Sequence, residues 1–174
     1  MDRFIQTILA EHRESWPESL DPVVMPFTLA LHRAYTVLYG RACTEMARFG
    51  LSPAEFDVLA TLRRAPRPHE LTPSQLQRSL VITSGGLTKV LHQLTSRGLV
   101  ERPRVEGDRR VKPVRLSATG QPLIEQAFQA VKQLTRDQVS AVLNPEESAA
   151  MTTLLVRLVP DESSCQIVRC EGQD

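Results

Sequence analysis

Basic side chains are concentrated between Arg97 and Arg115, in a chain that is otherwise close to neutral. This segment contains seven basic and three acidic residues, whereas the whole chain of 174 residues contains 21 basic and 20 acidic ones. The basic residues are Arg97, Arg102, Arg104, Arg109, Arg110, Lys112 and Arg115. A basic patch on a nearly neutral protein is typical of local contact with phosphate groups. The segment is therefore the first candidate for a nucleic-acid contact.

Polar side chains follow one face of an expected helix just before this segment. Leu87, Leu91 and Leu94 recur at helical spacing, so one face of that helix is expected to be buried. The opposite face carries Ser84, Thr88, Lys89, His92 and Gln93. Such side chains reach base edges and phosphates in a major groove, and the Gly85-Gly86 pair lets the start of the helix approach a phosphate closely. The pattern is typical of a recognition helix.

Two short β-segments, 99–102 and 111–116, are expected after this helix, joined by a polar and basic turn around Gly107. A hairpin beside a recognition helix is a wing. An arginine at its tip is expected to enter a narrow, A·T-rich minor groove, with Asp108 orienting its neighbour. The residues expected to contact DNA are Ser74, Gln75, Thr83, Ser84, Thr88, Lys89, His92, Arg104, Asp108, Arg109, Arg110 and Lys112.

Capping signals delimit the helices that must hold this segment in place. Ser52-Pro53-Ala54-Glu55 and Thr72-Pro73-Ser74-Gln75 both fit a capping box, so a helix is expected to begin at each. The second of these helices, a tight turn at 81–82 and the helix from Thr83 make a helix-turn-helix. The fold class expected is mainly α with a small β-wing, in which a winged helix-turn-helix lies between long N- and C-terminal helices.

The two ends of the chain carry long apolar stripes at helical spacing. No repeat or composition break divides the chain, so residues 1–174 are expected to form one domain. Its expected parts are accessory and dimerisation helices (1–49), the winged helix-turn-helix (52–117), C-terminal dimerisation helices (118–160) and a flexible tail (161–174). The stripes exceed what a compact core of this size covers, and a two-fold homodimer is the commonest way to cover them.

Several classes of protein are disfavoured by what the residues lack. No apolar run approaches the ~20 residues of a membrane span, and the N-terminus has no signal-peptide layout, so a cytoplasmic protein without membrane contact is expected. Cys43, Cys165 and Cys170 are too few and too dispersed for a disulfide framework or a zinc site. We found no set of nucleophile, base and orienting group, no phosphate loop and no metal spacing among the histidines. No enzyme activity, metal or cofactor is expected.

Three motifs together resemble the MarR family of bacterial transcription regulators over about residues 22–160. They are Ser96-Arg97-Gly98-Leu99-Val100-Glu101-Arg102, Gly107-Asp108-Arg109-Arg110 and Arg115-Leu116-Ser117-Ala118-Thr119-Gly120. The resemblance implies a winged-helix dimer, often a repressor released by a small ligand. Two recognition helices enter successive major grooves only if they lie roughly 34 Å apart, so an inverted-repeat operator in double-stranded DNA is expected.

Within that family, the run from Glu55 to Arg64 resembles the PecS and urate-responsive branch. The resemblance implies a ligand site built from Trp16, Tyr35, Asp57 and Arg102. The chain departs from the branch at two positions, because Trp16 lies late in its segment beside Pro17 and Val90 stands where the branch has a ligand-binding arginine. Without that arginine, an anionic purine loses a charge-assisted partner. A small aromatic or phenolic effector is therefore expected in preference to urate.

Two alternatives remain open from the sequence. Cys43 lies at helical distance from Arg41 and Arg48, which favours a thiolate and hence a redox-sensing regulator, although a buried thiol is the more frequent outcome. A winged helix also serves for protein association without DNA binding, but such a module needs a catalytic domain attached to it. Neither alternative has a motif as specific as the three above.

Overall fold

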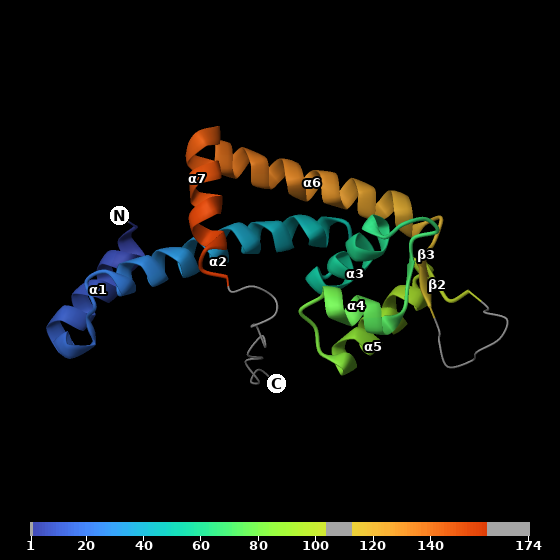
Figure 1. Cartoon of the computed structure of the whole chain (residues 1–174), viewed down its shortest axis with the longest axis horizontal. Coiled ribbons are helices and arrows are strands. Elements are labelled where there is room, and N and C mark those ends of the chain that lie inside the picture. The colour runs from blue at the N-terminus through green and yellow to red at the C-terminus, as the bar shows by residue number, and fades with distance from the viewer. Residues whose placement is uncertain (1, 104–112, 160–174) are drawn as a thin grey trace. The chain divides into compact units, whose positions relative to one another are not determined.

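The computed structural model describes residues 2–103 and 113–159 of the chain. The described residues divide into two compact units, one ending at Thr135 and the other beginning at Arg136, within a single long helix. The expected extent of the domain, 1–174, stays a prediction. The helices are α1 (Arg3–Ser15), the 3-10 helix η1 (Pro17–Ser19), α2 (Val24–Arg48), α3 (Pro53–Arg64), α4 (Pro73–Ser79), α5 (Ser84–Ser96), α6 (Gly120–Ser140) and α7 (Pro145–Val156), labelled in Figure 1.

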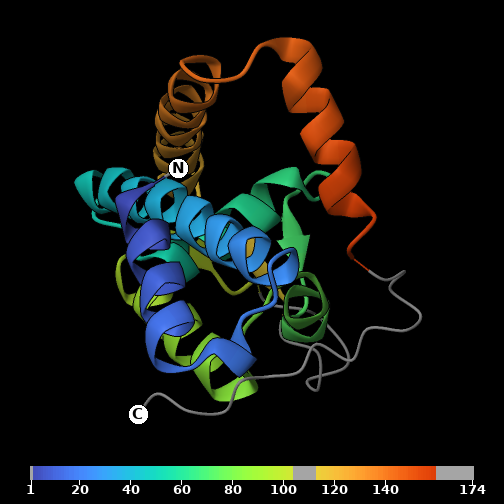
Figure 2. The same cartoon turned by 90° about the vertical axis from the view of Figure 1, so that its left-hand side faces the viewer.

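The N-terminal helices α1 and α2 lie side by side (Figure 2), with Ile5 and Leu9 of α1 buried. Asp21 lies just before α2, which begins at Val24, and its carboxylate accepts hydrogen bonds from the backbone N–H groups of Val23 (2.8 Å) and Val24 (2.7 Å). Gly50 ends this helix in the left-handed region, at φ 66°, which glycine adopts without steric cost. Both helix boundaries therefore follow from local chemistry.

Both expected capping boxes are present at the starts of later helices. Ser52 and Glu55 exchange hydrogen bonds at the start of α3, as do Thr72 and Gln75 at the start of α4. Ser117 accepts a hydrogen bond from the N–H of Gly120 at 2.9 Å, which sets the start of α6. A side chain that satisfies a free N–H group stabilises a helix start by about 1 kcal/mol. These contacts fix where each helix begins.

The sheet has three short antiparallel strands, β1 (Glu70–Leu71), β2 (Val100–Glu101) and β3 (Val114–Leu116), in the order β1-β3-β2. β2 and β3 fall within the two expected β-segments, although each is shorter than expected. Strand β1 was not predicted, because two residues carry no detectable alternation. It pairs Glu70 with Arg115, and this cross-strand pair forms an ion pair at 2.8 Å.

The core of the winged helix-turn-helix lies where α3, α4, α5, α6 and the sheet meet. The largest fully buried side chains there are Val58, Leu59, Leu62, Leu76, Leu91, Leu94, Val114 and Ile124. The leucines predicted for the inner face of α5 are among the buried residues, and Val90 is buried beside them. The prediction that these leucines form the buried face of α5 is therefore confirmed. The opposite face of α5 points away from the core.

Candidate functional site

The outer faces of α4 and α5 present most of the polar side chains predicted to contact DNA. Ser74, Gln75, Thr83, Ser84, Thr88, Lys89 and His92 are all exposed. Thr83 caps α5 by accepting a hydrogen bond from the N–H of Gly86 at 3.1 Å, and Thr88 donates its hydroxyl to the carbonyl of Ser84 at 3.0 Å. The side-chain oxygen of Gln75 accepts a hydrogen bond from the backbone N–H of Thr72 and so caps the start of α4. Lys89 and His92 lie one turn apart on the outer face of α5.

Basic residues of the segment 97–115 have different environments. Arg97 forms an ion pair with Glu55 at 2.7 Å, and Arg115 forms one with Glu70 at 2.8 Å. Arg102 is exposed directly after β2. Arg97 and Arg115 belong to the basic segment predicted to contact phosphates, and in the structure both form ion pairs. The predicted wing residues Arg104, Asp108, Arg109, Arg110 and Lys112 lie outside the described residues.

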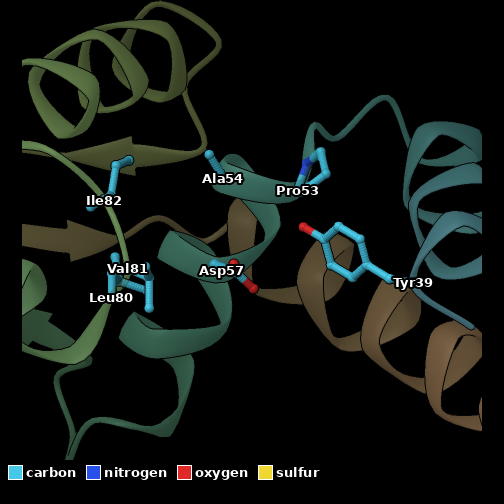
Figure 3. Close-up of a pocket in the computed structure, with 7 residues that line it drawn as sticks. All are labelled: Tyr39, Pro53, Ala54, Asp57, Leu80, Val81 and Ile82. Atoms are coloured by element: carbon cyan, nitrogen blue, oxygen red, sulfur yellow. The ribbon is translucent and has the colours of Figure 1, made fainter. Parts of the chain in front are cut away.

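A cavity of about 200 Å³ lies beside the start of α3 (Figure 3). Its lining comes from α2, from the first turns of α3, and from the turn that leads into α5. The lining residues are Tyr39, Pro53, Ala54, Asp57, Leu80, Val81 and Ile82. Figure 3 shows the ring of Tyr39 directing its hydroxyl toward α3, which carries Asp57. The cavity is therefore lined by the carboxyl group of Asp57, the hydroxyl group of Tyr39 and several apolar side chains, just before the start of α5.

Both polar groups of the cavity have shifted acidities. Asp57 is exposed to solvent at its edge of the cavity, and the partial shielding of its carboxyl group raises its pKa, an effect that the nearby Arg64 opposes. Burial also raises the pKa of Tyr39, with smaller contributions from Cys43, Tyr35 and Asp57. Tyr39 consequently remains a neutral hydroxyl at neutral pH, able to donate or to accept a hydrogen bond. The carboxylate of Asp57 can accept a hydrogen bond from a donor group of a ligand.

Of the four residues predicted to bind a ligand, Asp57 alone is in the lining of this cavity. Tyr35 is exposed and stacks on Tyr39, with ring centroids 5.2 Å apart. Trp16 is 62% exposed and stacks on His12, and Arg102 lies on the surface after β2. The sequence missed Tyr39, one turn along α2 from the predicted Tyr35. The ligand-binding roles of Trp16, Tyr35 and Arg102 stay predictions.

Asp57 and its neighbour Glu55 are expected to affect stability with opposite dependence on pH. The pKa of Asp57 is raised above its ordinary 3.8, so ionisation weakens folding once the pH rises through the folded-state value. Burial raises the pKa of Glu55, but hydrogen bonds from Ser52 and Arg97 outweigh it, so the net pKa lies below the ordinary 4.5. Its stabilisation is present above pH 4.5 and lost as the pH falls through the folded-state value.

We therefore expect Asp57→Asn to raise the midpoint of thermal unfolding at pH 7 and to change it less at pH 3. Glu55→Gln is expected to lower that midpoint at pH 7, with a smaller effect at pH 3. Thermal melts of the two variants and the parent at both pH values measure this. A destabilising Asp57→Asn at pH 7 would contradict the assigned shift of Asp57.

Cys43 is a half-buried free thiol close to Tyr39. Cys165 and Cys170 lie outside the described residues. Within residues 2–103 and 113–159, no cluster of three or more histidine, cysteine or acidic side chains is arranged to hold a metal ion. No helix in that part of the chain is long and apolar enough to cross a membrane. A redox role for Cys43 stays a prediction.

Comparison with known proteins identifies the family to which this chain belongs. A model of the MarR family matches residues 49–111, which include α3, α4, α5 and β2. The HTH-type transcriptional regulator PecS of Dickeya dadantii is 32% identical to the chain, over 91% of the chain and 95% of PecS. The chain belongs to the MarR family. The family and the fold class expected from the sequence are thereby confirmed.

Other members of the MarR family support the same assignment. The multiple antibiotic resistance protein MarR of Escherichia coli is 32% identical, over 63% of the chain and 74% of MarR. The crystal structure of a cysteine-to-serine variant of that MarR with operator DNA matches at a TM-score of 0.64 and 27% identity, covering 79% of the chain and all but 1% of that structure. MarR-family members are DNA-binding transcriptional regulators and not enzymes, as the sequence predicted.

Proposed function

We propose that this MarR-family regulator is a homodimeric repressor that binds an inverted-repeat operator and is released by a small aromatic or phenolic effector. The observation that carries the proposal is the exposed polar face of α5, opposite a buried face of leucines. Ser84, Thr88, Lys89 and His92 are the residues we assign to base edges and nearby phosphates in the major groove. The complex of Escherichia coli MarR with operator DNA supports this use of the fold.

The proposed wing contacts come from the sequence. Arg109 and Arg110 are assigned to an adjacent minor groove, Asp108 to orienting an arginine, and Arg104 and Lys112 to phosphates. Gly85 has open space around the position of an added Cβ, so its backbone is accessible for a close approach of phosphate. Together, α5 and the wing would hold one half of the operator.

Homodimerisation is proposed from the terminal helices. α7 has no buried residue, and its side chains Met151, Leu154 and Val156 are each 48% exposed or more. Along α2, only Met46 is buried among 25 residues. Exposed apolar surface of this extent marks an association surface. We assign residues 1–49 and 118–160 to the dimer, with the winged helix-turn-helix at 52–117 and the tail at 161–174.

A single charge placed on α7 is expected to break this dimer. Leu154 is 59% exposed in the single chain, so Leu154→Asp would be close to neutral for a monomeric protein. In the proposed dimer the same substitution buries an unpaired carboxylate in the interface. We therefore expect sedimentation equilibrium to show mainly monomer at micromolar concentration. Val81→Asp is the matched control, since Val81 is exposed but lies outside the terminal helices. A dimer that persists in Leu154→Asp would contradict the assignment of α7.

The effector is proposed to bind at the cavity between Tyr39 and Asp57. A volume of about 200 Å³ is smaller than the ~300–1,000 Å³ typical of pockets for drug-sized ligands, so it suits a single ring. The apolar wall of Leu80, Val81 and Ile82 fits that ring, and the carboxylate of Asp57 favours a phenolic hydroxyl that donates to it. No lysine or arginine is among the described lining residues, which favours a neutral phenol over an anion.

One set of measurements tests the function. DNA selected from a random pool by the purified protein should contain an inverted repeat, and its affinity should fall steeply with salt as counterions are released. Phenols, phenolic acids, salicylate and urate should then be compared for thermal stabilisation of the protein and release of that DNA. Asp57→Asn should weaken the response to phenols without abolishing DNA binding. If no sequence is enriched, the proposal fails.

The redox alternative has its own measurement. Peroxide that abolishes DNA binding by the parent chain, and fails to do so in Cys43→Ser, would make Cys43 the sensor in place of the cavity. Release by a phenol that persists in Cys43→Ser would support the effector cavity instead.

A further inference from the structure

Arg97 ends the recognition helix and reaches 42 residues back along the chain to Glu55. The guanidinium Nη1 donates to Oε1 of Glu55 at 2.7 Å. The other carboxylate oxygen of Glu55 accepts hydrogen bonds from the backbone N–H and the hydroxyl of Ser52, both at 2.9 Å. Glu55 is only 7% exposed. The carboxylate that caps α3 is therefore the same group that binds the end of α5.

The corner between α2 and α3 lies near this guanidinium. A Cβ added to Gly50, which follows α2, would lie 3.7 Å from Nη2 of Arg97. Arg97 thus binds the start of α3 from the end of α5, close to the end of α2. An ion pair whose acid is buried and hydrogen-bonded is held in a single geometry, unlike a mobile surface pair.

The opposite end of α5 is packed near the same turn of α3. Leu80, Val81 and Ile82, which precede the cap at Thr83, line the cavity together with Pro53 and Ala54 of α3. Figure 3 shows the irregular segment that carries Leu80, Val81 and Ile82 beside the helix that carries Ala54 and Asp57. Residues 53–57 therefore bind the finish of α5 through Glu55 and Arg97, and face the residues that precede the start of α5 across the cavity.

We propose that Arg97 is a positioning residue for DNA recognition: through Glu55 it sets the angle of α5 on α3, and with it the fit of the exposed face to the operator. The inference rests on the proposed sequence-specific binding. It assigns Arg97 no contact with DNA, although Arg97 belongs to the basic segment 97–115. Loss of the pair is expected to weaken operator binding more than binding to unrelated DNA, because only the operator complex requires base edges to be met at a fixed angle.

Glu55→Gln separates positioning from simple electrostatics. Glutamine keeps an acceptor for the capping box but removes the negative charge that holds Arg97. If Arg97 acted only as a cation near DNA, removal of a neighbouring anion would leave affinity unchanged or raise it. Positioning predicts that Glu55→Gln and Arg97→Ala both weaken operator binding, on the order of tenfold each. The double variant should be no weaker than Arg97→Ala alone, since the two changes remove one interaction.

Fluorescence anisotropy with the selected operator and with an unrelated duplex, at several salt concentrations, measures these effects on the full-length protein. Each variant is assayed well below its own midpoint of unfolding. Arg63→Ala is the matched control, because it breaks the 2.6 Å ion pair between Arg63 of α3 and Glu125 of α6, which does not involve α5. It is expected to lower stability and to leave the ratio of operator to unrelated-DNA affinity within about twofold of the parent.

The proposed positioning role is supported if both single variants have a lower ratio of operator affinity to unrelated-DNA affinity than the parent. The slope of log affinity against log salt should at the same time equal that of the parent. A salt slope lower by about 0.9 per protomer in Arg97→Ala would mean a lost phosphate contact, and would overturn the inference. Tighter or unchanged operator binding by Glu55→Gln would overturn it as well. A parent protein that prefers no sequence would instead overturn the proposed function itself.

Discussion

Lys89→Glu is expected to bind the operator on the order of 100-fold more weakly than the parent chain, with little change in stability. Lys89 is exposed on the outer face of α5, beside Thr88 and one turn before His92. The variant removes a cation and adds an anion in each protomer of the proposed dimer. If Lys89 neutralises one phosphate per protomer, the slope of log affinity against log salt should fall by about 0.9 for each.

The same reversal of charge elsewhere provides the control. Arg67→Glu alters an exposed position between α3 and β1, outside α5 and outside the proposed dimerisation helices, and gives the protein the same net charge. It should retain most of the operator affinity. Equal losses in the two variants would mean that overall charge, and not the face of α5, governs binding, and would remove Lys89 from the proposed interface.

Gly120→Ala is expected to lower the free energy of unfolding by about 3 kcal/mol, which is at the upper end for a change of one methyl group. An added Cβ would overlap the carbonyl oxygen of Leu99 and lie 3.0 Å from its carbon. These are backbone atoms next to β2, and the same carbonyl accepts a hydrogen bond from Ser117 at 3.2 Å. The start of α6 has to move away from the sheet to admit the methyl group.

Urea unfolding of Gly120→Ala and of Gly85→Ala compares two helical glycines with opposite surroundings. Gly85 has no atom within 4 Å of an added Cβ, and alanine in a helix is favoured over glycine by about 0.5–1 kcal/mol. Gly85→Ala should therefore be at least as stable as the parent. A Gly120→Ala variant of parental stability would show that the contact with Leu99 relaxes at no cost.

Features encoded in a few neighbouring residues were predictable from the sequence. The capping boxes at Ser52 and Thr72, the left-handed Gly50 and the buried leucine face of α5 all appear where local chemistry places them. Each depends on contacts within about four residues, so propensity and spacing suffice to find it. The exposed polar face of α5 follows directly, because it is the complement of the buried one.

Features that depend on distant residues were not predictable in this way. The two-residue strand β1 exists because Glu70 and Leu71 pair with β3, 43–45 residues later. The ion pair between Arg97 and Glu55 likewise joins separate helices. Tyr39 lines the cavity, and Tyr35 stacks behind it, because of the rotation of α2 about its axis relative to α3. A rotation of this kind is set by tertiary packing and leaves no local mark in the sequence.

The sparse burial of α2 bears on how long the protein lasts in a cell. A helix of 25 residues with one buried side chain is stabilised little by packing against its own chain. In the proposed dimer, packing against the partner therefore supplies most of the stability of α2. Folding is then linked by mass action to the concentration of protomers. Proteases that cleave opened chains remove lone protomers faster than paired ones. A modest drop in synthesis would therefore cause a more than proportional drop in the amount of regulator, giving its abundance a threshold.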